Sequence, residues 1–174
     1  MKIAVIGYSG SGKSTLARKL GEIYSADVLH FDRVQFLPNW EVRPFEEKLA
    51  LTQEFLDSHT SWVIDGNYSK LFYDRRMAEA DIIISLRFSR ISCLFRAHRR
   101  YRKYKNTTRP DMGDGCNEKF DLDFVKWLLI GGRSGKEKAR RKETESKYGE
   151  KLVVIRNQRQ LDAFLNTLPL PEKS

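Results

Sequence analysis

Cysteine is scarce in this 174-residue chain, which contains only Cys93 and Cys116. Their spacing matches no zinc-binding pattern, and two isolated cysteines are more typical of reduced, buried thiols than of a disulfide. Long apolar runs are also lacking. The longest, Phe124 to Ile130, is interrupted by Lys126 and is far shorter than the ~20 residues that a membrane-spanning helix needs. We therefore expect no disulfide, no cysteine-based metal site and no transmembrane helix.

The chain shows no secretory signal, because glycines and Lys13 directly follow the short apolar stretch from Met1 to Ile6. Internal repeats and low-complexity linkers are absent too. The residues are 40% hydrophobic and 32% charged, a balance that is typical of soluble globular proteins and not of disordered or fibrous ones. We predict a cytoplasmic protein in which residues 1–174 form a single domain around one core.

Negative charge is in deficit, since 23 Asp and Glu oppose 32 Lys and Arg and leave a formal charge of +9. A field of this sign attracts anions, and both nucleotides and nucleic acids qualify. Much of the excess lies in residues 87–105 and 133–147, and charge runs on helices are as a rule solvated faces. Charge alone does not choose between these partners.

Short apolar runs alternate with helical patterns along the chain. Strands are predicted at residues 3–6, 28–31, 62–64, 82–86 and 152–155. Helices are predicted at residues 13–24, 44–58, 89–104 and 158–165, with two further helical stretches before the last strand. Residues 106–117 are polar, contain glycine and proline, and are typical of a mobile loop. The alternation indicates a parallel, right-handed α/β sheet with helices on both faces.

One motif carries specific chemistry. Residues 7–14, Gly-Tyr-Ser-Gly-Ser-Gly-Lys-Ser, fit the pattern G-x-x-x-x-G-K-[ST] and lie between a predicted strand and a predicted helix. Glycines let successive N–H groups point inward, the helix N-terminus adds a favourable field, and Lys13 reaches the β- and γ-phosphates. Ser14 is predicted to bind Mg²⁺. The alternative is a flexible Gly/Ser turn. The residues predicted to bind ATP are Gly7, Tyr8, Ser9, Gly10, Ser11, Gly12, Lys13, Ser14 and Thr15.

Two further stretches resemble known enzymes. Residues 63–66 (VIDG) resemble a strand end of adenylate-kinase-like enzymes, and residues 62–69 (WVIDGNYS) and 109–116 (RPDMGDGC) resemble the DNA topology modulation proteins, a family of FlaR-related P-loop kinases. The similarity spans nearly the whole chain. It implies a three-layer P-loop NTPase fold, a five-stranded parallel sheet in the order 2-3-1-4-5, and a small lid at about residues 105–118. It also implies ATP as the phosphoryl donor, with adenine held by residues 156–158 in the loop after the fifth strand, where Arg156 is the predicted binding residue.

The stretch from Asp65 to Ser69 departs from adenylate kinase itself. That enzyme has Asp-Gly-Phe-Pro-Arg where this chain has Asp-Gly-Asn-Tyr-Ser, so the arginine expected to hold an acceptor phosphate is missing. The difference argues against AMP as the acceptor.

Two carboxylates follow predicted strands. Asp65 ends an interior strand, which in a parallel sheet points at the ligand crevice, and it is predicted to orient Mg²⁺ through water. The alternative is a helix cap or a turn carboxylate. Asp32 follows the second strand toward the same crevice and is the candidate base or hydroxyl anchor, because phosphoryl transfer needs mainly a positioned hydroxyl. A solvated cap or a partner for Arg33 is nearly as good an explanation.

Arginines follow the helix that leads into the predicted lid. They are Arg96, Arg99, Arg100 and Arg102, with Arg90 upstream. Arg96 shares a helix face with Arg99 or Arg100, and one or two of the four are predicted to neutralise the transferring phosphoryl group while the rest are solvated. Gly113 and Gly115 would let the lid close and exclude water, unless the segment is an inert surface loop. Phe36, Trp40, Tyr68 and Phe72 are more typical of packing than of base stacking.

These features together predict a Mg-ATP-dependent phosphotransferase with a small-molecule acceptor, either a nucleoside or nucleotide or a hydroxylated metabolite. The alternative is a basic nucleic-acid-binding regulator that uses ATP as a switch, although no helix-turn-helix, zinc or RNA-recognition pattern occurs. No membrane partner is expected, and the oligomeric state stays open.

Overall fold

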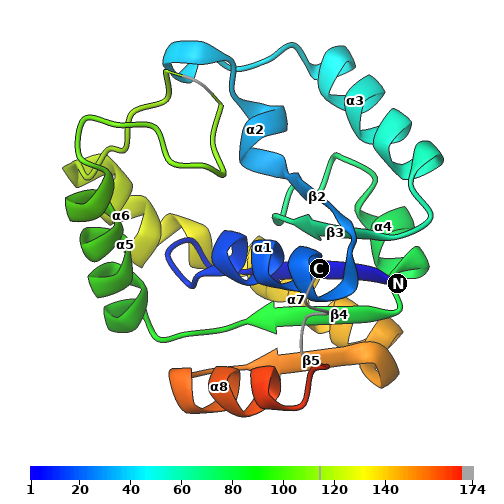
Figure 1. The fold of residues 1–174 in the computed structure, drawn as a ribbon. Helices are drawn as coiled ribbons and strands as arrows, with labels where there is room; N and C mark the ends of the chain where they lie inside the picture. The colour runs from blue at the N-terminus through cyan, green and yellow to red at the C-terminus, as the bar shows by residue number, and fades with distance from the viewer. Residues whose placement is uncertain (114, 170–174) are drawn as a thin grey trace.

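The computed structural model describes residues 1–113 and 115–169 and contains a five-stranded sheet in which all the pairs are parallel (Figure 1). The strand order is β2-β3-β1-β4-β5, as predicted. β1, β3 and β4 are interior strands, and their near-continuous apolar sequences follow from burial on both faces. The strands are β1 (Lys2–Gly7), β2 (Asp27–His30), β3 (Trp62–Asp65), β4 (Ile82–Leu86) and β5 (Leu152–Ile155).

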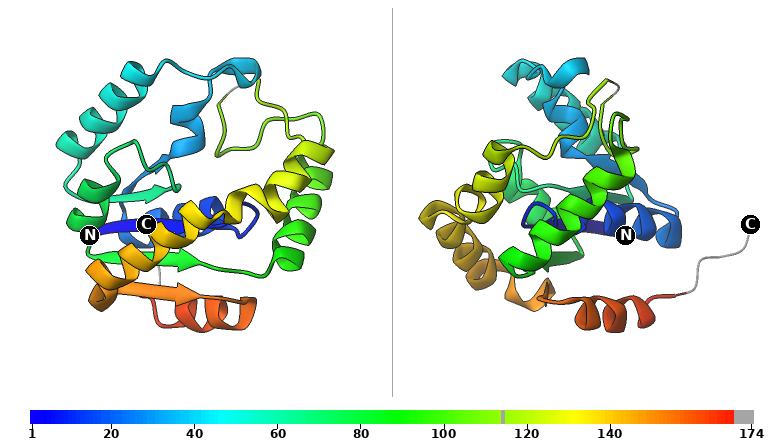
Figure 2. Two further views of the ribbon diagram at one scale, coloured as in Figure 1. Left: turned by 180° about the vertical axis from the view of Figure 1, so that it is seen from behind. Right: turned by 90° about the vertical axis from the view of Figure 1, so that its left-hand side faces the viewer.

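Helices cover both faces of this sheet (Figures 1 and 2). Val5 and Ile84 pack against Leu16 and Leu20 of α1 (Lys13–Tyr24), with Leu161 of α8 (Gln158–Asn166) in the same cluster. The alternate strand positions point the other way, where Ala4, Ile6 and Ile64 pack with side chains of α3 (Phe45–Ser58) and α4 (Tyr73–Glu79), and Tyr148 of α7 (Gly135–Tyr148) joins them. The result is the three-layer α/β fold that the strand pattern indicated.

Two helices stand beside the carboxyl end of the sheet. These are α5 (Arg90–Tyr104) and α6 (Leu122–Leu129), which lie side by side in both views (Figures 1 and 2). The Ser89 hydroxyl caps α5 by accepting a hydrogen bond from the Ser92 amide at 3.1 Å, which ends the strand-to-helix connection cleanly. Three short 3₁₀ turns complete the described chain: η1 (Pro38–Trp40), η2 (Gly131–Arg133) and η3 (Gly149–Lys151).

Two short helices were not predicted. Residue 31 was expected to end a strand, but Phe31 opens α2 (Phe31–Gln35), and α4 was missed altogether. Helices of one or two turns carry too little periodicity to be read from sequence, and both depend on tertiary packing: Phe31 and Met77 are fully buried.

The predicted lid segment packs against the segment that follows β2. Residues 105 and 118 form one isolated bridge and residues 108 and 117 another, so the segment folds back on itself. The Cys116 thiol donates to the Leu37 carbonyl at 3.2 Å, and the Trp40 indole donates to the Asn117 carbonyl at 3.0 Å. The sequence indicated a mobile loop, whereas the structure has the segment docked through buried side chains. Asp114, which the lid prediction includes, lies outside the described residues.

The expectations drawn from scarce residue types can also be compared with the structure. Cys93 and Cys116 are both free and buried, as expected. Within residues 1–113 and 115–169, no helix is both long and apolar enough to cross a membrane.

Candidate functional site

The loop from Gly7 to Lys13 connects β1 to α1 and has the backbone geometry of an anion cradle. Gly7 has φ 146°, and a Cβ there would lie 2.3 Å from the Leu86 carbonyl oxygen, so only glycine fits. Gly10 and Gly12 also have positive φ. Within the described residues, the amides of Gly10, Gly12, Lys13 and Ser14 have no hydrogen-bond acceptor. Unpaired amides at a helix N-terminus are the groups that bind phosphate.

The Tyr8 carbonyl holds the loop together from inside. It accepts hydrogen bonds from the Ser11 amide at 3.2 Å, the Ser11 hydroxyl at 2.6 Å and the Lys13 ammonium at 3.1 Å. Burial lowers the pKa of Lys13 below its ordinary value, and the nearby carboxylates of Asp65 and Asp32 partly oppose this shift. Lys13 is therefore a poorly hydrated cation without an ion-pair partner among the described residues, a state that a phosphate would stabilise.

Asn67 fixes the start of the cradle, a role that sequence reasoning missed. Its amide oxygen accepts from the Gly7 N–H at 2.9 Å, and its amide nitrogen donates to the Gly7 carbonyl at 2.8 Å. β3 has already ended at Asp65, so this side chain continues the pairing that the β3 backbone no longer provides. The only available signal was the position of an asparagine two residues beyond an interior strand.

Asp65 is buried at the end of β3 and is held by a second residue that was missed. The His30 Nδ1 atom lies 2.9 Å from Asp65 Oδ1, and both side chains are about 5% exposed. The imidazole fixes the rotamer of the carboxylate at the wall of the cavity that Ser14 also lines.

Ser14 and Asp65 fit a magnesium ion whose other ligands come from a bound nucleotide and from water. No group of three or more His, Cys, Asp and Glu side chains in the described chain could hold a metal by itself. One hydroxyl and one carboxylate are instead the few protein groups that Mg²⁺ uses when phosphate oxygens and water supply the rest.

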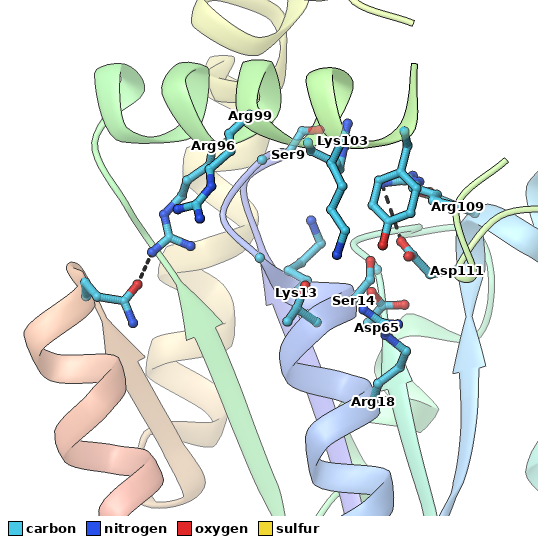
Figure 3. A pocket seen from close by; sticks show the side chains of 18 residues that line it. Ser9, Lys13, Ser14, Arg18, Asp65, Arg96, Arg99, Lys103, Arg109 and Asp111 are labelled. Carbon is cyan, nitrogen blue, oxygen red and sulfur yellow. Dashed lines mark hydrogen bonds and ion pairs between the residues drawn. The ribbon is translucent and has the colours of Figure 1, made fainter. Parts of the chain in front are cut away.

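A cavity of about 570 Å³ opens between this loop and α5 (Figure 3). Seven cationic side chains line it against three carboxylates, a surplus that suits a polyphosphate. In Figure 3, Arg96, Arg99 and Lys103 come from α5 on one side, while Lys13, Ser14 and Asp65 come from the sheet side. The sequence-predicted residues that line this cavity are Ser9, Gly10, Gly12, Lys13, Ser14, Thr15, Asp32, Asp65, Arg96, Arg99 and Arg100.

The three predicted arginines of α5 differ in their partners. Arg96 donates to the Gln158 side chain and to the Ser11 carbonyl, and its guanidinium lies 4.2 Å from the centre of the Phe88 ring. Arg100 is paired with Glu118 at 2.6 Å, and its burial, together with nearby Arg109, lowers its pKa. Arg99 has no hydrogen bond or ion pair with any residue that the structure describes.

Arg156 is the predicted site residue that stands apart. It is exposed, its amide donates to the Gln160 side chain at 2.7 Å, and it is not among the residues that line the cavity. Gln158, two residues farther on, lines the cavity instead and holds Arg96.

Asp32 stands at the centre of a hydrogen-bond chain that runs from Tyr68 to Arg109. One carboxylate oxygen accepts from the Tyr68 hydroxyl at 2.8 Å, and the other accepts from Arg109 Nη2 at 3.0 Å. Burial and the Asp32 charge raise the pKa of Tyr68 above its ordinary value, so this hydroxyl stays protonated and donates. Arg109 also lies 3.4 Å from Asp111 and 3.4 Å from Glu118, and all three side chains are buried.

A second cavity, of about 510 Å³, lies on the other side of the phosphate loop. It shares Ser9, Lys13, Asp32 and Gly66 with the first. Its other walls include Tyr8, Tyr68 and Trp127, together with Glu137 and Arg140 of α7. The two cavities therefore meet at the lysine and the carboxylate that phosphoryl transfer would require.

Two more cations approach the phosphate loop from the α7 side. Arg133 and Arg141 lie 3.5 and 4.6 Å from the centre of the Tyr8 ring. Sequence reasoning treated residues 133–147 as a solvated charge run, and only the fold brings these side chains to the loop.

Solved structures match this fold. Deoxyadenosine kinase from M. mycoides with bound dATP aligns with a TM-score of 0.55 at 16% identity, covering 95% of this chain and 98% of that one. The same kinase with bound dCTP aligns with a TM-score of 0.51 at 15% identity, covering 95% and 97%. A gluconokinase from Sinorhizobium meliloti 1021 aligns with a TM-score of 0.54 at 18% identity, covering 96% and 89%. No protein-family model and no curated protein sequence matches.

At these identities the likeness establishes the fold and nothing finer. The chain has the P-loop NTPase fold of these kinases, and its resemblance to the DNA topology modulation family stays a prediction.

Proposed function

We propose that this chain is a kinase that binds ATP with Mg²⁺ in the first cavity and transfers the γ-phosphoryl group to a hydroxyl of a small molecule in the second. The observation that carries the proposal is the junction of the two cavities at Lys13 and Asp32. With ATP in the first cavity and the acceptor in the second, the donor phosphate and the acceptor hydroxyl can meet at these two residues.

The phosphates of ATP would lie on the free amides of Gly10, Gly12, Lys13 and Ser14, with the Lys13 ammonium on the β- and γ-phosphates. Ser14 and Asp65 would hold Mg²⁺, which when bound supplies charge neutralisation for the phosphates. The cationic face of α5 would neutralise the rest of the polyphosphate, and Arg99, which has no partner among the described residues, is free to do so at no cost in broken ion pairs.

Asp32 would orient the acceptor hydroxyl. Tyr68 and Arg109 fix both of its oxygens, so the carboxylate presents its remaining lone pairs in one direction. The transition state of phosphoryl transfer is loose and requires little proton abstraction before bond formation, so a held carboxylate serves mainly as an anchor. Met112 and Cys116, buried in the docked lid, help to keep water from this region.

No feature of the described residues favours the nucleic-acid regulator over the kinase. Four of the six cationic side chains of α5 line the cavity, and two of these four already bind Gln158 and Glu118. A titration with duplex DNA across salt concentrations tests the point, since a kinase of small molecules should show no sequence-independent affinity with a steep salt slope.

The direct test is ADP release with Mg-ATP and a panel of nucleosides, nucleotides and sugar acids. Asp32→Asn should retain ATP affinity and lose about 10²- to 10⁴-fold in kcat, whereas Lys13→Met should lose ATP affinity. Asp27→Asn is the matched control, because Asp27 is exposed at the start of β2, and the opposite end of that strand leads into α2 and Asp32. Full activity of Asp32→Asn would remove the anchor, and an absence of ADP release with every acceptor would remove the kinase.

A further inference from the structure

We propose that the second cavity takes an uncharged acceptor with a planar ring and a hydroxyl, the chemistry of a nucleoside, and that Trp127 is the surface on which the ring stacks. The inference rests on the proposed function for the identity of the reacting hydroxyl and for the assignment of Lys13 to ATP. The binding site itself follows from the charge and the aromatic lining of this cavity.

The charge of the second cavity differs from that of the first. Apart from the shared residues, its charged side chains are Lys70, Glu137 and Arg140. Arg140 and Glu137 form an ion pair at 3.0 Å, which leaves the exposed Lys70 unpaired within the described chain. The shared Lys13 is also unpaired there, and the proposed function assigns it to the phosphates of ATP. A phosphate or carboxylate group placed near Asp32 and Glu137 would find little to neutralise it, and an unpaired anion is costly to desolvate. The cavity is therefore suited to a neutral molecule.

Trp127 gives the cavity an aromatic wall. Its side chain is 50% exposed, although large aromatic side chains usually bury most of their surface. Gly131 and Gly132 let the chain pass close to the indole, since a Cβ on Gly131 would lie 2.9 Å from the Trp127 ring. Phe124 stacks near it with ring centres 6.3 Å apart. The indole is thus held by neighbours on some sides and open to the cavity on another, which is the form of a stacking platform.

A neutral polar group stands in the same cavity. The Gln35 side-chain oxygen accepts a hydrogen bond from the Lys48 ammonium at 3.2 Å, and Lys48 is buried. The side-chain oxygen of Gln35 is therefore occupied, and the NH₂ group of Gln35 has no acceptor among the described residues. The free NH₂ group can donate to a heteroatom on the edge of a ring. A sugar acid offers no ring to stack and adds a negative charge, whereas a nucleoside monophosphate adds two charges for which, once ATP occupies Lys13, Lys70 is the unpaired cation of the cavity.

Binding can be tested without catalysis by following tryptophan fluorescence. Nucleosides, their 5′-monophosphates and gluconate are titrated into the wild-type protein and into Trp127→Phe, with Mg²⁺ and a non-hydrolysable ATP analogue present to fill the phosphate loop. We expect saturable quenching by at least one nucleoside in the wild type, no such signal in Trp127→Phe, at least about tenfold weaker binding of its monophosphate, and no response to gluconate. Of the other two tryptophans, Trp62 is fully buried and Trp40 lines neither cavity, so neither should respond.

Catalysis supplies the second readout. Trp127→Leu should raise KM for the nucleoside about tenfold or more, the usual effect of losing one base–aromatic stack, and leave KM for ATP unchanged. Trp127→Phe should restore most of the affinity. Phe95→Leu is the matched control, because Phe95 is an exposed aromatic residue on α5 that lines neither cavity.

The outcomes separate this proposal from the kinase. If a monophosphate or a sugar acid binds as tightly as the nucleosides and is phosphorylated, the nucleoside proposal is wrong while the kinase stands. If nucleosides quench Trp127 but no ADP is released with any acceptor, the binding site stands and the kinase is wrong. If no nucleoside changes the emission, the proposal is overturned whatever the activity.

Discussion

Replacing Asn67 tests whether a side-chain amide outside the phosphate loop holds that loop in shape. Asn67→Leu keeps a similar volume and leaves the buried N–H and C=O of Gly7 without their partners at 2.9 and 2.8 Å. A buried polar group that loses its partner costs about 1–3 kcal/mol, so the free energy of unfolding should fall by roughly 2–5 kcal/mol. For a chain of this size the melting temperature should drop by about 2–4 °C per kcal/mol.

Two measurements check this expectation. Urea unfolding gives the change in stability and, through an unchanged m-value, shows that the unfolded state has not shifted. ATP titration should show weaker binding, because the nucleotide must then order the start of its own cradle. Asn67→Asp keeps the bond from the Gly7 amide but sets a carboxylate oxygen against the Gly7 carbonyl, so it should weaken ATP binding more than it lowers stability.

Asn166→Leu is the matched control, since Asn166 is exposed at the end of α8, and it should change stability by less than about 0.5 kcal/mol. If Asn67→Leu behaves like this control, the reasoning about the cradle is refuted.

Three further substitutions address other parts of the molecule. Arg76 is fully buried and donates to the carbonyls of Gly66, Tyr68 and Leu71, and burial lowers its pKa to about 9. Arg76→Met should therefore lower the free energy of unfolding by about 2–4 kcal/mol and raise the KM for the acceptor. Arg75→Met on the surface should lower it by under about 1 kcal/mol, and equal effects of the two substitutions would contradict this reasoning. Hydrogen bonds from Lys2 and Arg75 lower the pKa of Glu79. The stability that Glu79 contributes, about 0.5–1 kcal/mol, is therefore present above pH 4.5 and is lost as the pH falls through the folded pKa. Glu79→Gln should be less stable than wild type at neutral pH and equally stable in acid, and a difference that persists in acid would count against the pairing. Gly7→Ala should lose about 2–5 kcal/mol in thermal unfolding because its Cβ would meet the Leu86 carbonyl, whereas Gly149→Ala, with open space around it, should change little.

Local patterns were readable from the sequence, and packing was not. The strands at residues 82–86 and 152–155 and the helix at 13–24 were predicted at the observed bounds, because each is a continuous apolar run or a clean helical pattern. The glycine-rich loop was readable for the same reason, since the residues that form it are consecutive.

The partners of the site residues were not readable. His30 and Asp65 are 35 residues apart, Gly7 and Asn67 are 60 apart, and Asp32 and Arg109 are 77 apart. Nothing within either member of such a pair points to the other, and only the crossing of the sheet and the docking of the lid bring them together. Trp127 was overlooked for a related reason: a half-exposed indole is informative only when it is known to line a cavity.

The ion pairs that dock residues 105–118 have a kinetic consequence. Arg109 touches three carboxylates, those of Asp32, Asp111 and Glu118, and Glu118 also holds Arg100. Lifting only part of this segment would leave a buried carboxylate or guanidinium without its partner, so the segment should detach as a unit or stay docked. In the proposed kinase, a two-state release of this kind would make departure of the products, and not the transfer itself, the slow step of each cycle.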